Sequence, residues 1–205
     1  MKPYAAYAIG AALVDTEIQV TDAELSAMGV EKGMMTLVNQ DRQREMLALL
    51  SDHLIAANHA SGGSAGNSMI ATAMMGAPTY MSCKVAQDAD GDIYLADLEH
   101  SGVAHGLTDR SSDGVTGKCI VLITPDAERS LNTHLGISET LSTDEVDEAA
   151  IKDSAWVYLE GYLVTSPTGH AAALKTKALA EQCGALTAVS FSDPGIVKLF
   201  RDNMA

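Results

Sequence analysis

Short apolar runs alternate with helical segments through the second half of the chain, and this alternation constrains the fold more than any other feature. Trp156 to Leu159 has the pattern of a strand, Ser166 to Cys183 of a long Ala-rich helix, and Leu186 to Phe191 of another strand. Successive strand–helix–strand units with right-handed crossovers build a parallel sheet that carries helices on both faces. The sequence therefore predicts an α/β fold of three layers, α/β/α, with a mostly parallel sheet.

The first half of the chain adds a buried strand and a second, smaller sheet. Tyr4 to Val14 is mostly apolar without clean alternation, which is typical of a strand covered on both faces. Half-exposed strand patterns near residues 16–38 and 103–133 do not fit the parallel scheme, and they predict a small antiparallel flap beside it. Within the flap, Thr116 to Thr124 and Arg129 to Thr133 have the pattern of a hairpin.

Polar residues mark several helix starts. Thr21–Glu24 and Ser142–Glu145 are capping boxes, in which the first hydroxyl and the last carboxylate each accept a hydrogen bond from the other residue's backbone N–H. The second box predicts a helix that continues to about Lys152. Asp41 is a suitable cap for a helix that runs to about Ala57.

Charge and composition argue against several classes of protein. A formal net charge of −14 without a dense Lys/Arg cluster argues against nucleic-acid binding. No apolar stretch reaches the roughly 20 residues that span a bilayer. The three cysteines, Cys83, Cys119 and Cys183, are widely spaced and odd in number, so we expect neither a disulfide framework nor a zinc site. We therefore expect a cytoplasmic protein whose cysteines are buried and reduced and whose side chains form no metal site.

The glycine-rich run Ser61–Asn67 opens directly into an apolar helix that continues through Met75. Paired glycines let backbone N–H groups approach a ligand closely, and the helix N-terminus presents its positive end to the same place. Asn67 can both donate to and accept from a hydroxyl group. For the run taken alone, an ordinary glycine-rich connection into a helix is the favoured explanation, because short motifs have many false matches.

Asp15 adds a second polar group, since it stands where the predicted first strand ends. Ligands of open α/β sheets bind beyond the carboxyl ends of the strands. A carboxylate at that edge can accept two hydrogen bonds from the hydroxyl groups of a sugar. Taken alone, Asp15 has a second explanation as an ordinary turn residue.

Taken together, these segments resemble the N-terminal part of the ribokinase-like (PfkB) carbohydrate and nucleoside kinases. The matching segments, in the family's order, are Ile9–Asp15, Gly62–Asn67, Gly76, Lys84–Asp88, Tyr158–Glu160 and Ser192–Pro194. The resemblance implies a ribokinase-like α/β domain with a β-lid, formed by segments of about 16–38 and 103–133, that closes over a small-molecule substrate. It also implies that Asp15, Gly62, Gly63 and Asn67 hold substrate hydroxyls. Glu160 matches a glutamate that contacts the sugar in ribokinases, or it is a strand-end surface carboxylate.

The activity implied by the resemblance is ATP-dependent phosphorylation of a nucleoside or sugar hydroxyl, with Mg²⁺. Ser64 stands where ribokinases usually carry Lys, and the Gly-Gly-Ser-x-x-Asn form is similar to adenosine kinases, which favours an adenosine-like nucleoside. Ala11 and Leu13 occupy the places where either branch carries an asparagine, so a sugar substrate stays open. Lid-to-lid dimers occur in the family, and a homodimer of this kind is compatible with the resemblance.

The family's catalytic aspartate lies in a G-A-G-D segment, which this sequence does not contain. We therefore expect residues 1–205 to be an N-terminal part without the C-terminal nucleotide-binding part, with no catalytic residue and little or no activity by itself. Leu186 to Phe191 would then form an unpaired apolar edge. One alternative is a non-catalytic sugar- or nucleoside-binding module derived from such a kinase. Another, a Rossmann-like oxidoreductase domain, is disfavoured because the G-x-G-x-x-G fingerprint is missing.

Overall fold

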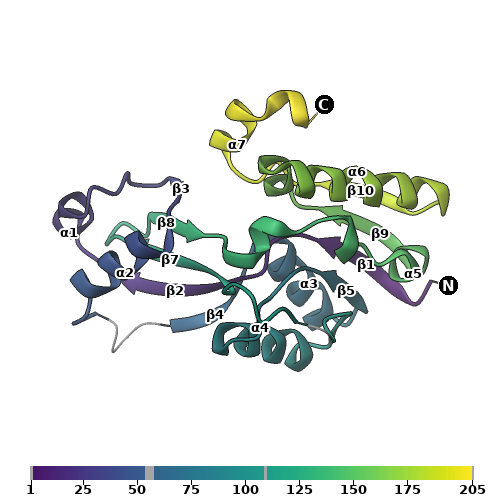
Figure 1. Ribbon diagram of the computed structural model, residues 1–205, viewed down its shortest axis with the longest axis horizontal. Helices are drawn as coiled ribbons and strands as arrows, with labels where there is room; N and C mark the ends of the chain where they lie inside the picture. The colour runs from purple at the N-terminus through teal and green to yellow at the C-terminus, as the bar shows by residue number, and fades with distance from the viewer. Residues whose placement is uncertain (1, 54–57, 109, 205) are drawn as a thin grey trace.

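A computed structural model describes residues 2–53, 58–108 and 110–204 (Figure 1). The main sheet has five strands, and every neighbouring pair in it runs parallel. From one edge to the other the strands are β10 (Leu186–Val189), β9 (Ser154–Leu159), β1 (Tyr4–Ile9), β5 (Thr79–Ser82) and β6 (Val103–His105).

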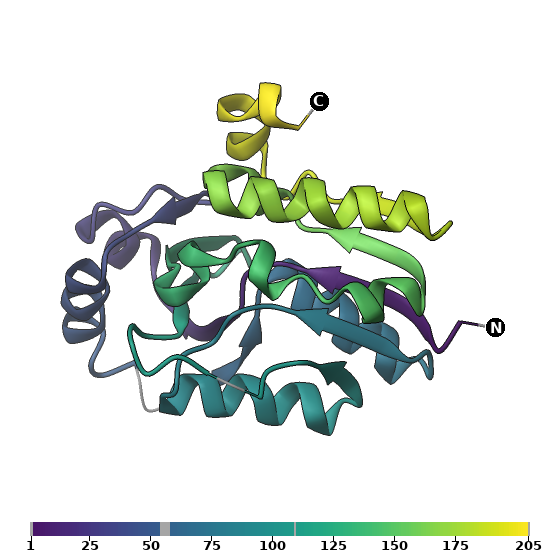
Figure 2. The ribbon, with the colours of Figure 1, turned by 45° about the vertical axis from the view of Figure 1, so that its right-hand side comes forward.

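Helices cover both faces of the main sheet (Figure 2). Helices α3 (Ser64–Met74) and α4 (Ala89–His100) pack on one face, and α5 (Glu148–Lys152) and α6 (Pro167–Gln182) pack on the other. The predicted three-layer α/β arrangement is therefore confirmed. The predicted long helix after Ser166 is α6, and Ser166 caps it by accepting a hydrogen bond from the Gly169 N–H.

The central strand β1 explains why its sequence shows no alternation. Tyr7 and Ile9 are buried against α5 and α6, whereas Ala8 between them is buried in the core formed with α3 and α4. Both faces of the strand therefore require apolar side chains. Burial of apolar side chains stabilises the fold by about 25 cal/mol for each Å² removed from water. Because both faces of β1 are buried, this strand stabilises two cores at once.

A second sheet, which also has five strands and is called the small sheet below, stands beside the carboxyl ends of the main strands. Its strands, in order, are β3 (Met35–Leu37), β8 (Arg129–His134), β7 (Gly117–Ile123), β2 (Leu13–Gln19) and β4 (Asn58–Gly62). The predicted hairpin is confirmed as the antiparallel pair of β7 and β8. The expectation of a purely antiparallel sheet was wrong, because β2 pairs with β7, and β3 with β8, in parallel. Strands β2 and β7 start side by side, at Leu13 and Gly117, and run outward together.

The borders of the small sheet differ from the predicted segments at two places. Val103–His105 pairs with β5 in the main sheet, because Val103 is buried in the core beneath α4. Ser61 and Gly62, which were expected to begin a glycine-rich loop, belong instead to Asn58–Gly62, which pairs with β2. The predicted single strand from Tyr4 to Val14 is likewise two strands, separated at Gly10–Ala12, where the chain passes from one sheet to the other.

Two helices cover the outer face of the small sheet, which leaves its inner face toward the main sheet. Helix α1 (Asp22–Ala27) starts at the predicted Thr21 capping box, which is confirmed. Helix α2 (Gln40–Leu49) starts earlier than expected, with Asn39 as its cap. The predicted end of this helix near Ala57 lies outside the described residues.

Short helices complete the fold. The Ser142 capping box is present, but it opens only a single turn, and α5 begins again with Asp147 as its own cap. The remaining elements are η2 (Gly136–Thr140), η3 (Thr143–Glu145), η4 (Gly161–Thr165), α7 (Pro194–Leu199) and η5 (Arg201–Asn203).

Candidate substrate-binding site

A cavity of about 790 Å³ lies between the inner face of the small sheet and the carboxyl ends of the main strands. The main domain contributes turns that follow β1, β9 and β10, together with the first turns of α3, α6 and α7. Much of the small-sheet wall is apolar and includes Leu13, Met35, Leu37, Cys119 and Leu131. Such a cavity, apolar with a few polar groups that converge on it, is the usual form of a small-molecule site.

Asp15 lies on the inner face of the small sheet and lines the cavity. It is the third residue of β2, not the end of β1 as predicted, but the short Gly10–Ala12 crossing keeps it beside the main sheet. Burial raises the pKa of its carboxyl to about 6, and the charge of Arg129 partly opposes this rise. Among the described residues, no residue donates a hydrogen bond to this carboxylate.

Gly62 and Gly63 are required as glycines for two different reasons. A Cβ on Gly62 would overlap the carboxylate of Asp15, so Gly62 lies beneath Asp15 and does not itself line the cavity. Gly63 lines the cavity with φ +88°, a conformation that side chains disfavour, and a Cβ there would overlap the carbonyl of Ala11. Gly62 therefore leaves room for the Asp15 carboxylate, and its predicted contact with substrate hydroxyls stays a prediction.

Asn67 is exposed and lines the cavity from the first turns of α3. Helix α3 is capped by Gly63, which has no side chain to bond the first N–H groups of the helix. One of these N–H groups, that of Ala65, donates to the buried carboxylate of Glu160 (3.1 Å), so the protein itself places a carboxylate at the positive end of the helix. The predicted grouping of Asp15, Gly63 and Asn67 around one space is therefore present in the structure.

Glu160 also reaches the cavity wall, but it is only 2% exposed. It follows β9 and accepts hydrogen bonds from the Ala11 N–H (2.8 Å), the Ser64 hydroxyl (2.6 Å) and the Ala65 N–H (3.1 Å). Burial raises the pKa of this carboxyl, while the hydrogen bonds oppose the rise. The alternative of a strand-end surface carboxylate was wrong, because the side chain is buried.

Sequence reasoning missed several cavity residues. Arg129, Leu131 and Thr133 alternate along β8, and that period of two is the signal that would have placed them on the inner face. Ser138 was also missed. Its buried hydroxyl accepts from the Ala12 N–H (3.1 Å) and lies 3.0 Å from the carbonyl of Ala12 and 3.2 Å from that of Lys84, so it ties the sheet crossing to the segment that follows β5. No local pattern marks such a contact, because the partners are far apart in sequence.

Asp88, in the turn that the resemblance singled out, connects the two sheets. Its carboxylate caps α4 through the Gly91 N–H (2.8 Å) and accepts from the N–H (2.8 Å) and hydroxyl (2.6 Å) of Thr116, just before β7. These hydrogen bonds lower the pKa of Asp88 although burial opposes them. The base of the small sheet is thereby attached to the main domain.

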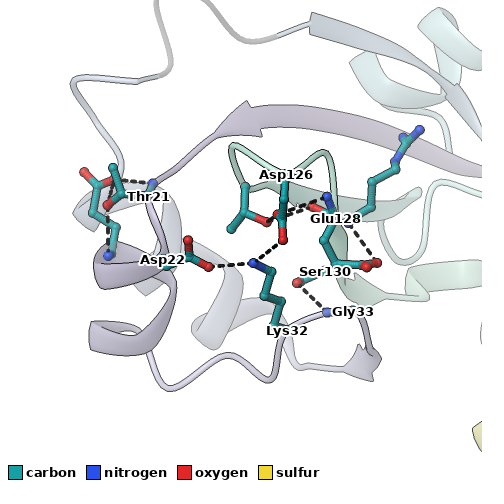
Figure 3. Close-up of polar contacts among 10 residues, drawn as sticks. Thr21, Asp22, Lys32, Gly33, Asp126, Glu128 and Ser130 are labelled. Carbon is teal, nitrogen blue, oxygen red and sulfur yellow. Dashed lines mark hydrogen bonds and ion pairs between the residues drawn. The ribbon is translucent and has the colours of Figure 1, made fainter.

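The outer rim of the small sheet is held by the ion pairs of Lys32 (Figure 3). The Lys32 ammonium lies 2.6 Å from Asp22 at the start of α1 and 2.8 Å from Asp126 in the β7–β8 turn. The next residue, Gly33, donates its N–H to the Ser130 hydroxyl (3.0 Å). This arrangement positions the following segment, Met34–Leu37, which forms one wall of the cavity.

Comparisons with known proteins agree with this geometry. The sequence profile of the pfkB family carbohydrate kinases matches residues 26–204, which is most of the chain. The chain belongs to the pfkB family of carbohydrate kinases. This membership leaves the oxidoreductase alternative without support.

Solved structures similar to this pfkB-family chain include a "probable sugar kinase protein" from Rhizobium etli CFN 42, with 30% identity and a TM-score of 0.92. An adenosine kinase from Sinorhizobium meliloti has 33% identity and a TM-score of 0.91. The match covers 100% and 98% of this chain, respectively, and 61% of each solved chain. The curated ribokinase of Mus musculus is 25% identical over 126 residues, which are 62% of this chain and 38% of the ribokinase. The pfkB-family chain thus spans less than two thirds of the length of these relatives.

Other expected features of this pfkB chain concern metals, cysteines and membranes. Within residues 2–53, 58–108 and 110–204, no group of three or more His, Cys, Asp or Glu side chains is arranged to hold a metal ion. All three cysteines are free, and Cys183 is only half-buried, unlike Cys83 and Cys119. No helix in the described part is both long and apolar enough to cross a membrane.

Proposed function

We propose that this chain is the substrate-binding part of an ATP-dependent kinase that phosphorylates a hydroxyl group of an adenosine-like nucleoside or of a sugar. The observation that carries the proposal is the Asp15 carboxylate, which faces the cavity beside Gly63 and the first turn of α3 and has no hydrogen-bond partner among the described residues. A carboxylate and the side-chain amide of Asn67 that line one space are suited to a ligand that offers several hydroxyl groups.

The apolar wall of the cavity favours a nucleoside over a simple sugar. Leu13, Leu37 and Leu131 line the side formed by the small sheet, opposite the polar turn at Gly63. A nucleoside has a flat, weakly polar base next to its hydroxyl-bearing ribose, so its two parts match the two walls. A sugar has hydroxyls on all sides and would leave the apolar wall unused.

Binding is tested by isothermal titration calorimetry of the chain with adenosine, ribose and fructose. We expect adenosine to bind most tightly, and we expect Asp15→Asn to lower its affinity about ten-fold or more, because a charge-assisted hydrogen bond is lost. Asp41→Asn is the matched control, since Asp41 is an exposed acid on α2 that does not line the cavity. If Asp15→Asn binds all three compounds with wild-type affinity, the binding site does not lie in this cavity.

Phosphoryl transfer is tested separately, with ATP, Mg²⁺ and whichever compound binds. Transfer requires a positioned base and charge-stabilising groups, and the G-A-G-D segment that supplies the base in this family does not occur in the sequence given. We expect the 205-residue chain to bind its ligand without measurable transfer. The non-catalytic binding module is the second candidate, favoured by the same observation, and turnover by this chain would exclude it.

A further inference from the structure

The carboxylate of Glu160 is bonded within the protein through both of its oxygens. Its Oε2 accepts the Ala11 N–H, and its Oε1 accepts both the Ser64 hydroxyl and the Ala65 N–H. These donors come from two separate segments, the crossing between β1 and β2 and the start of α3. A carboxylate that is almost fully buried and already bonded through both oxygens has little capacity left for a ligand.

The space around Glu160 is tightly packed. A Cβ added at Gly10 would lie 2.8 Å from Oε2 of Glu160 and 2.6 Å from the Cβ of Ala65, both shorter than an ordinary contact. The carboxylate therefore cannot turn toward the cavity without giving up bonds to buried donors, and an unpaired buried donor costs about 1–3 kcal/mol.

We propose that Glu160 is a positioning residue, which clamps the sheet crossing to the first turn of α3, and is not a ligand of substrate hydroxyls. The proposal rests on the proposed function. The crossing leads within four residues to Asp15, and the clamped turn of α3 carries Gly63 and Asn67. Glu160 thus sets the distance between the groups on the two sides of the ligand.

Ser64 is part of this clamp. Its hydroxyl donates to Glu160 over 2.6 Å, the shortest of the three bonds. Because the Ser64 hydroxyl donates to Glu160, the two side chains satisfy one another instead of the ligand. Among the described residues, the other carboxylates of the cavity wall keep acceptor positions: Asp15 and Glu139 accept no hydrogen bond, and Asp193 accepts one, from the Gly195 N–H (2.6 Å).

A cycle of variants and deoxy ligands distinguishes positioning from contact. The affinities of wild type, Glu160→Gln and Asp15→Asn are measured by calorimetry for adenosine and its 2′-, 3′- and 5′-deoxy analogues. Glutamine has a single acceptor oxygen, so it breaks the clamp on one side. We expect Glu160→Gln to weaken all four ligands by the same factor, about ten-fold. For Asp15→Asn, we expect the loss of affinity to be smaller for the deoxy analogue that lacks the hydroxyl group bound by Asp15.

The opposite pattern would overturn the inference. If the loss in Glu160→Gln disappears for one deoxy analogue, Glu160 contacts that hydroxyl directly. Should Glu160→Gln fail to fold, Ser64→Ala removes one of the three bonds and is expected to give a smaller loss that is again uniform across the four ligands. A loss confined to one analogue in Ser64→Ala would contradict the clamp in the same way.

A measurement without ligand keeps this inference separate from the proposed function. In ¹H–¹⁵N spectra of the free protein, the amide protons of Ala11 and Ala65 are expected downfield, and Ser64→Ala or Glu160→Gln is expected to move them. If wild type binds neither adenosine nor its analogues, the nucleoside assignment fails, while the amide shifts still test the clamp. Amides of Ala11 and Ala65 that do not respond to either variant would exclude it.

Discussion

The carboxylate of Asp15 lies directly over the α-carbon of Gly62, on the neighbouring strand of the small sheet, so closely that a Cβ on Gly62 would overlap it. The glycine therefore determines where the carboxylate stands, although it does not line the cavity itself. In the proposed site, ligand hydroxyls that bind Asp15 would depend on a residue that they do not contact.

Gly62→Ala tests this relationship. The added methyl group must displace the Asp15 carboxylate, so we expect adenosine affinity to fall about ten-fold or more, since ligand groups misplaced by about 1 Å lose most of their effect. Gly29→Ala is the control, because Gly29 has φ +66° with no atom near its missing Cβ. It should cost about 1 kcal/mol of stability without changing affinity. Equal affinity of Gly62→Ala and wild type would contradict the relationship.

The pKa of Asp15 predicts how ligand affinity depends on pH. This pKa is about 6, above the ordinary value of 3.8, because burial disfavours the charged form. The ionised carboxylate accepts stronger hydrogen bonds from hydroxyl groups than the protonated carboxyl does, so adenosine affinity should rise as the pH increases through about 6. Calorimetry between about pH 5 and 8 measures this rise, and Asp15→Asn should show a flatter profile. A wild-type profile as flat as that of the variant would be inconsistent with the raised pKa.

The same pKa has the opposite effect on the stability of the free protein. Between about pH 4 and 6 the folded chain holds a proton on Asp15 that the unfolded chain has released. The contribution of this group to the free energy of unfolding is therefore largest below about pH 4 and is lost as the pH rises through about 6. Denaturant unfolding across this window should show the free energy of unfolding falling more with rising pH in the wild type than in Asp15→Asn. Parallel profiles for the two proteins would count against the raised pKa.

Asp88 is expected to matter for stability because Thr116 depends on it. Asp88→Ala removes the cap of α4 and leaves the N–H and hydroxyl of Thr116, which is fully buried, without this partner. We expect a loss of about 1–3 kcal/mol in the free energy of unfolding. Asp41→Ala on the exposed face of α2 is the control and should change stability by less than about 0.5 kcal/mol. Denaturant titration measures both, and equal losses would argue against the connection.

The edge strand β10 predicts self-association of this chain. Leu186, Val189 and Phe191 at or beside this edge are each more than half exposed. Apolar edges with unpaired backbone groups pair readily with other chains. The double variant Leu186→Lys with Val189→Lys should shift the protein toward monomer in light scattering after gel filtration. Leu174→Lys, on an exposed site of α6, should leave the distribution unchanged, and a monomeric wild type at high concentration would refute the prediction.

The alternation of strands and helices determined the three-layer fold by itself, because the signals that produce it are local. Each βα unit has an apolar run buried on both faces, a cap such as Ser166, and a stop such as Gly184. These signals act over a few residues, so they are readable from the chain. The hairpin of β7 and β8 and the grouping of Asp15, Gly63 and Asn67 followed from patterns of the same short range, the latter with the help of the family resemblance.

What only the tertiary structure decided lies in contacts between distant segments. The break of the first apolar run at Gly10–Ala12 depends on where the small sheet receives β2, and the assignment of β6 to the main sheet depends on the burial of Val103. The environment of Glu160 depends on donors 96 and 149 residues away. Sequence patterns indicate which residues prefer burial or a capping position. Whether a carboxylate bonds within the protein or stays available to a ligand depends on the donors that folding places around it.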